Sequence, residues 1–152
     1  MLSQSDPAAA EALYRSTIRQ IEQEHGSDSA ALLPLLNGLM DLVVHVSGGP
    51  TGEAFRLAGD IHRIQVELHG SESEPAARAL LVVGRLHEVN GTTATAEELY
   101  REALGIAKAA CAPKCDTLVI AYSMLRDLIK TDPARQAEAD ALNALAEESG
   151  ER

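Results

Sequence analysis

Apolar side chains recur along most of this chain at spacings of three and four residues, which is the period of an amphipathic α-helix. Within residues 8–24, Leu13, Tyr14, Ile18 and Ile21 fall on one helical face. The pattern stops at short segments rich in glycine and polar residues, the clearest of which is residues 47–52. We therefore expect helices joined by short connections, and no strand.

Helix-start signals recur between the predicted helices. Asp6-Pro7 and Asp132-Pro133 each place a capping side chain before a proline at the first helical position, and Asp28-Ser29 offers another cap. The predicted helices span residues 8–24, 29–47, 51–69, 73–90, 95–110, 116–130 and 132–148. Short connections are what helical hairpins require, so the sequence predicts an all-α fold of about seven helices.

Two segments of the sequence repeat at a fixed period. Ala-Glu-Ala-Leu-Tyr-Arg at residues 10–15 returns as Ala-Glu-Glu-Leu-Tyr-Arg at residues 96–101, which is 86 residues later, or two periods of 43. His-Gly-Ser-Asp-Ser at residues 25–29 returns as His-Gly-Ser-Glu-Ser at residues 69–73. Because one helical unit cannot bury its apolar face alone, such periodicity indicates several stacked copies of one unit.

The segment AEELYREAL at residues 96–104, together with the helix before it, resembles the tetratricopeptide repeat. The period matches the longer form, of about 42 residues, seen in kinesin light chains and many bacterial proteins. In that family a small–aromatic–small series on the second helix matches Ala96, Tyr100 and Ala103, and a large–small pair on the first helix matches Val83-Gly84. The resemblance implies a right-handed α-solenoid of stacked antiparallel helix pairs.

The resemblance implies one domain, residues 1–152, made of a lone capping helix at 7–26 and repeats at 28–70, 72–110 and 115–148. The last repeat departs from the pattern, with Asp132 in place of the loop glycine and Ala141 in place of the aromatic residue, as suits a terminal cap. We expect Gly84 to lie where two helices touch, with Tyr100 filling the space beyond it.

Composition and charge narrow the classes of partner. Hydrophobic residues make up 45% of the chain and aromatic residues only 3%, so the core should consist mainly of Ala, Leu, Val and Ile. The net charge of −10, without any run of Lys or Arg, argues against a nucleic-acid partner and against anionic membranes. Ten of the 13 basic residues are Arg, which together with abundant Ala is typical of a GC-rich bacterial genome.

Nothing in the first 24 residues resembles a targeting signal, because they lack a basic start followed by a continuous apolar stretch. The most apolar run, residues 30–46, is interrupted by Pro34, Asn37, Asp41 and His45, so it is predicted to be too short and too polar to span a bilayer. We expect a cytoplasmic protein, although a secreted domain cut from a longer precursor would look the same.

Metal, cofactor and catalytic sites are not expected. Cys111 and Cys115 lie in a predicted loop without a nearby histidine, which leaves a zinc site two ligands short. Two reduced cysteines are favoured over a disulfide. The five histidines are scattered, and neither a phosphate-binding loop nor a nucleophile beside a base is present, so the chain is not expected to be an enzyme.

The resemblance implies a concave groove lined by the first helix of each repeat. Asp41, Arg85 and Arg126 occupy equivalent positions on those helices, one turn after Asn37, Leu81 and Tyr122. The predicted partner-binding residues are Asn37, Asp41, Leu81, Arg85, Glu88, Tyr122 and Arg126. The alternative is that the charged residues among them are ordinary surface residues that contact no partner.

The expected function is a scaffold or adaptor that binds a protein or peptide segment in this groove. Leu81 and Tyr122 would form its apolar floor, the two arginines would attract acidic groups, and Asp41 would favour a basic group. The alternative is a self-associating structural or secretion accessory protein, a homo-oligomer that uses the exposed face of a terminal helix.

Overall fold

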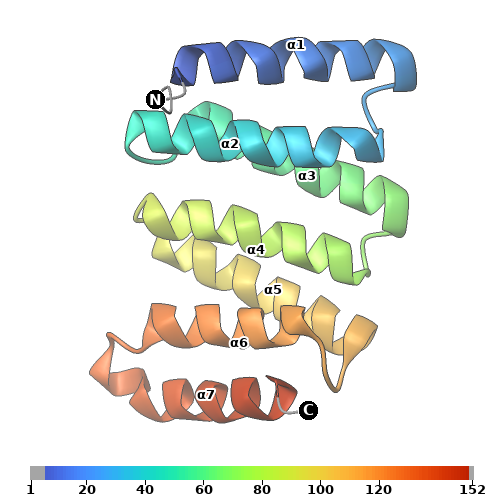
Figure 1. The fold of residues 1–152 in the computed structure, drawn as a ribbon. Coiled ribbons are helices and arrows are strands. Elements are labelled where there is room, and N and C mark those ends of the chain that lie inside the picture. Colours follow the sequence, from blue (N-terminus) through green and yellow to red (C-terminus); the bar gives the residue numbers. More distant parts are fainter. Residues whose placement is uncertain (1–5, 151–152) are drawn as a thin grey trace, which may run out of the picture. The chain divides into compact units, whose positions relative to one another are not determined.

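The structure, a computed structural model, describes residues 6–150, and all the regular secondary structure within them is helical (Figure 1). The α-helices are α1 (Pro7–His25), α2 (Leu33–Ser47), α3 (Gly52–His69), α4 (Glu74–Val89), α5 (Thr93–Cys111), α6 (Asp116–Ile129) and α7 (Gln136–Gly150). Two 3-10 turns, η1 (Ala30–Leu32) and η2 (Pro133–Arg135), lead into α2 and α7. The all-α prediction is confirmed, and each predicted helix lies close to its expected position.

Side-chain caps explain why the helices begin where they do. The Asp6 and Asp132 carboxylates each accept a hydrogen bond of 3.0 Å from the backbone N–H two residues later. Ser29 caps η1 and Ser73 caps α4 in the same manner, through their hydroxyl oxygens. α1 ends at His25 and is followed by Gly26, whose φ of +86° is open to glycine and strained for other residues. These local signals were all readable from the sequence.

The chain forms two compact units, residues 1–68 and residues 69–152. Their boundary falls close to the predicted end of the repeat at 28–70. In the first unit α1 packs on α2, and an ion pair of 2.8 Å between Arg15 and Glu53 joins α1 to α3. Arg63 of α3 pairs with Asp28 in the connection that follows α1. In the first unit, α3 is therefore joined by ion pairs to α1 through its first turn and to the connection after α1 through its second half.

In the second unit each helix packs against the next, from α4 to α7, and α4 also contacts α6 (Figure 1). Its core is continuous and is built mainly from Ala, Leu and Ile, which are three of the four residue types expected from the composition. Tyr100 is the largest fully buried side chain among the described residues. The core of this unit is therefore centred on the helix that carries the clearest repeat motif.

Gly84 lies at the contact predicted for it. A Cβ atom at this position would lie 2.5 Å from Cε1 and 2.7 Å from Cδ1 of Tyr100. Distances under 3.0 Å are essentially never seen for real Cβ atoms, so α4 and α5 can approach this closely only because residue 84 is a glycine. The predicted Gly84–Tyr100 contact is confirmed.

One segment, Ala30–Ser47, is long and apolar enough by length and composition to cross a membrane. The interruptions at Pro34, Asn37, Asp41 and His45 therefore do not exclude it on those two criteria. The core helix of a soluble protein passes the same test, and five side chains of this segment are buried in the structure: Leu32, Leu36, Leu39, Met40 and Val43. The segment is weak evidence for a membrane protein.

Candidate binding site

The predicted groove residues of the first unit lie on α2. The Asn37 side chain donates a hydrogen bond of 2.8 Å to the backbone oxygen of Leu33 on its own helix, and Asp41 is exposed. The other five predicted residues lie in the second unit. The two sets therefore belong to separate compact units.

Leu81 and Tyr122, which were expected to form an apolar floor, are part of the core of the second unit. Their exposed fractions are 3% and 5%, and both pack within the continuous apolar cluster. The Lys108 ammonium group lies 5.6 Å from the centre of the Tyr122 ring. These two side chains belong to the core of the second unit, and neither lines any of the hollows described below.

The remaining predicted residues of the second unit differ in how many hydrogen bonds and ion pairs they already form within it. Arg126 donates a hydrogen bond of 2.7 Å to Asn143 of α7 and pairs with Asp127 at 3.0 Å. Glu88 accepts a hydrogen bond of 2.6 Å from the hydroxyl of Tyr100. Arg85 is exposed. A small hollow of about 230 Å³ beside Arg126 is lined by α7, by Arg126 of α6 and by Lys130, which directly follows α6.

A larger hollow, which the sequence did not predict, lies in the first unit. Its volume is about 380 Å³, and it is lined by α1, α2 and α3. We call it the α1–α3 groove. Its lining residues are Arg15, Ile18, Arg19, Glu22, Leu36, Leu39, Arg56, Leu57 and Asp60. The four apolar members are all at most 9% exposed, so they form the floor and the charged side chains form the rim.

The α1–α3 groove opens on a different side of α2 from the predicted one. Successive residues of an α-helix are rotated by about 100°. Leu36 and Leu39 therefore lie on the side of α2 away from Asn37 and Asp41. The family resemblance pointed to one face of this helix, and the structure places the hollow on the other.

The charges on the rim are unevenly distributed. The first unit contains four basic residues, Arg15, Arg19, Arg56 and Arg63, and three of them line the groove. These three precede Glu22 on α1 and Asp60 on α3, so one end of the groove is basic and the other is acidic. In a chain of net charge −10, this gathering of arginines is a local exception.

The three arginines differ in their existing partners. Arg15 pairs with Glu11 at 2.6 Å and with Glu53 at 2.8 Å, and its hydrogen bond holds the pKa of Glu53 below the usual range. Arg56 contacts Glu53 at 3.4 Å, and its side chain is 65% exposed. Arg19 donates to the backbone oxygen of Arg15 at 3.3 Å and has no carboxylate partner among residues 6–150. Arg19 and Arg56 thus have donors to spare.

A second apolar hollow, of about 340 Å³, lies between α1 and α2 and is lined by Ala10, Leu13, Tyr14, Thr17 and Leu35. Leu13 is 68% exposed, the most of any large hydrophobic residue described. We call this surface the α1 outer face. The sequence anticipated it, because the predicted lone helix lacks a partner helix from its own repeat.

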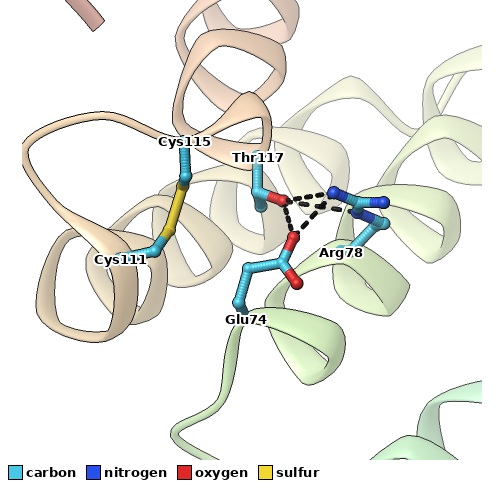
Figure 2. Close-up of a disulfide and its surroundings, with 5 residues drawn as sticks. All are labelled: Glu74, Arg78, Cys111, Cys115 and Thr117. Carbon is cyan, nitrogen blue, oxygen red and sulfur yellow. Dashed lines mark hydrogen bonds and ion pairs between the residues drawn. A yellow bond between two sulfur atoms is a disulfide. The ribbon is translucent and has the colours of Figure 1, made fainter.

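A disulfide and a polar cluster lie at the connection from α5 to α6 (Figure 2). Cys111 and Cys115 are joined, with their Cα atoms 5.9 Å apart, so the expectation of two reduced cysteines is wrong for this structure. Thr117 is fully buried, donates a hydrogen bond to Glu74 and accepts hydrogen bonds of 3.2 and 3.3 Å from Arg78 (Figure 2). This cluster anchors the start of α6 to α4.

The structure brings together no group of three or more His, Cys, Asp or Glu side chains able to hold a metal ion, within the part of the chain that it describes. No protein-family model matches the chain, and no curated protein matches it. Any statement about function therefore depends on the surfaces described above.

Proposed function

We propose that this chain is a protein-interaction scaffold built from stacked helix pairs of the tetratricopeptide type. Two matching sets of ion pairs support the repeat assignment. Arg15 joins Glu11 on its own helix to Glu53 on α3, at 2.6 and 2.8 Å. Arg101 joins Glu97 on its own helix to Glu138 on α7, at 2.7 and 2.5 Å. The same bridge, from one helix to the second helix after it, thus occurs twice.

The observation that carries the proposed function is the α1–α3 groove, with its apolar floor and charged rim. Binding energy at protein interfaces is concentrated in a few apolar and aromatic anchors and arginines. Charges around such a site select the partner and orient it. The groove offers these features in a volume of about 380 Å³, which suits part of a peptide or of a protein segment.

The proposal is tested by immobilising the full chain and exposing it to extract from its native cells. We expect saturable retention of one or a few proteins, which excess free chain displaces. Immobilised chain that has been unfolded with urea serves as the control and should retain none of them. If native and unfolded chain retain the same proteins, or if free chain displaces none, the scaffold proposal is contradicted.

Self-association is a second candidate, and the α1 outer face favours it. An exposed leucine above an apolar hollow offers a contact surface to a second copy of the chain. Light scattering should then show a dimer that Leu13→Glu abolishes. Val89→Glu is the matched control, because Val89 is 56% exposed and lies on α4. A monomer at every concentration would exclude this candidate.

A further inference from the structure

We propose that the α1–α3 groove takes a short peptide segment with an acidic side chain at one end, aliphatic side chains in the middle and a basic side chain at the other end. This inference rests on the proposed function, that the chain binds protein segments. It adds the chemistry and the direction of the segment, and it assigns the contact to a face of the first unit that the sequence did not predict.

The basic end of the groove determines where the carboxylate of the peptide's acidic side chain binds. Each guanidinium group carries five N–H donors, and a carboxylate can accept two of them in parallel. Arg15 is committed to Glu11 and Glu53. Arg19 has no carboxylate partner within residues 6–150, and the large exposed fraction of Arg56 leaves it free to turn. A carboxylate placed between Arg19 and Arg56 would therefore gain contacts without breaking the stronger ion pairs.

The floor of the groove accounts for the aliphatic residues. Ile18, Leu36, Leu39 and Leu57 come from all three helices of the first unit and line the same hollow. Because these four side chains are at most 9% exposed, the apolar surface removed from water would be mainly that of the peptide's aliphatic side chains, which is still favourable. Neither a free phosphate nor an acidic side chain could use this part of the groove, so the floor favours a peptide over a simple anion.

The acidic end of the groove determines the direction and the length of the bound peptide. Glu22 and Asp60 line the groove beyond the arginines, and Asp60 contacts Arg63 only at 3.7 Å. The Arg19 side chain points back along α1, because its Nε donates to the backbone oxygen of Arg15, so the basic end lies close to the level of Arg15. Glu22 lies seven residues after Arg15 on α1, which is about 10 Å at 1.5 Å per residue. An extended peptide covers this distance in about three residue steps. A tetrapeptide core of the order acidic, aliphatic, aliphatic, basic therefore fits both ends.

The experiment is an NMR titration of the full chain, labelled with nitrogen-15, with the acetylated and amidated peptide Glu-Leu-Leu-Lys. We expect saturable shift changes confined to amide signals of α1, α2 and α3 around the groove. The scrambled peptide Leu-Glu-Lys-Leu, which has the same composition, should bind at least about tenfold more weakly, because its charges cannot reach both ends. Inorganic phosphate should not reproduce the shifts of the residues at the floor.

Two variants localise the contact. Arg19→Glu should weaken binding of Glu-Leu-Leu-Lys by about tenfold or more and should strengthen binding of Lys-Leu-Leu-Lys, which is a charge-swap rescue. Lys114→Glu changes the net charge equally, lies on the loop between α5 and α6, and should leave the affinity unchanged. Far-UV circular dichroism verifies folding, and Arg56→Gln replaces Arg19→Glu if the latter is unfolded.

Several outcomes would overturn the inference. Equal binding of the scrambled peptide, identical shifts with phosphate, or shifts centred on Arg85 and Arg126 would each place the contact elsewhere or reduce it to ion attraction. Absence of any shift would also overturn it. If the immobilised chain nevertheless retains native proteins, the scaffold proposal stands and only the assignment of this groove fails.

Discussion

Nearly the same six-residue motif occurs in α1, at residues 10–15, and in α5, at residues 96–101, and its two copies differ in their surroundings. In both, a glutamate and an arginine four residues later form an ion pair along the helix, and the arginine reaches a second carboxylate on a later helix. The tyrosines diverge. Tyr100 is fully buried, whereas Tyr14 is only half-buried.

The two tyrosines also lie against different helices. Tyr100 packs on Gly84 of the helix before its own, and Tyr14 packs on Gly38 of the helix after its own. α5 is packed between α4 and α6, whereas α1 packs along α2. The motif itself therefore determines the ion pair along its own helix, while the neighbouring helices determine how deeply its aromatic residue is buried.

The largest expected difference comes from adding a methyl group at the two glycines. At Gly84 the new Cβ would lie 2.5 Å from Cε1 of the Tyr100 ring, which is fully buried and cannot turn toward water. Gly84→Ala should lower the free energy of unfolding by about 1–3 kcal/mol. At Gly38 the new Cβ would meet the end of the Tyr14 side chain, which can turn toward water. Gly38→Ala should change the free energy of unfolding by less than about 1 kcal/mol, because alanine also favours the helix.

Urea unfolding followed by circular dichroism measures both variants. Glu98→Ala, at an exposed position of α5, is the control and should change the free energy of unfolding by less than about 0.5 kcal/mol. Equal losses for the two glycine variants would show that the burial of the tyrosine does not matter, and the comparison between the two helices would lose its basis.

A smaller difference is expected from the two tyrosine hydroxyls. Tyr100 donates a 2.6 Å hydrogen bond to the carboxylate of Glu88, so Tyr100→Phe should lower the free energy of unfolding by about 1.5 kcal/mol. Tyr14→Phe should change it by less than about 0.5 kcal/mol, since Tyr14 is only half-buried. Urea unfolding measures both variants, and a larger loss for Tyr14→Phe would contradict the expected order.

The buried hydroxyl of Tyr100 should also affect how the free energy of unfolding depends on pH above neutrality. Burial, and then the bond to Glu88, raise the pKa of Tyr100 well above its usual value. In the unfolded chain the Tyr100 hydroxyl ionises near pH 10, whereas in the folded chain it keeps its proton. The free energy of unfolding should therefore fall as the pH rises through about 10. Tyrosinate absorbance of the wild type should show an ionisation that occurs only when the protein unfolds. Tyr100→Phe should remove that transition.

Local features of this fold could be predicted from the sequence. The caps at Asp6, Ser29, Ser73 and Asp132 lie within three residues of the groups that they bind, so sequence order alone identifies them. The contact between Gly84 and Tyr100 followed from the repeat motif, because a glycine between helices and an aromatic residue at a fixed spacing occur together. The bounds of the seven helices depend on such short-range chemistry.

The candidate site could not be predicted in the same way. Leu81 and Tyr122 occupy suitable positions along their helices, but their depth depends on how the neighbouring helices rotate, which no local pattern records. The α1–α3 groove combines side chains from three helices. A usable signal was present nonetheless: Arg15 and Arg19 are four residues apart on one helix of a strongly acidic chain. The disulfide between Cys111 and Cys115 depended on redox state, which spacing does not reveal.

The smallest expected difference is between the carboxylates of the two ion-pair sets. Hydrogen bonds from Arg135 and from Arg101 lower the pKa of Glu97 to about 2, against the opposing effect of burial. These arginines also both pair with Glu138, which closes a ring of four charges between α5 and the segment formed by η2 and α7. Arg15, with a weaker contribution from Arg56, lowers the pKa of Glu53 in the first unit, without such a ring.

A lowered pKa in the folded chain means that the ion pair stabilises the fold fully above the unfolded pKa of about 4.5 and loses this effect as the pH falls toward about 2. Because these side chains are partly exposed, we expect the effect to be under about 1 kcal/mol and to weaken with salt. Urea unfolding at a series of pH values should show that Glu97→Gln flattens the dependence in this window more than Glu53→Gln does. Equal flattening would mean that the ring adds nothing to a simple bridge, and the two copies of the motif would then differ only in their tyrosines.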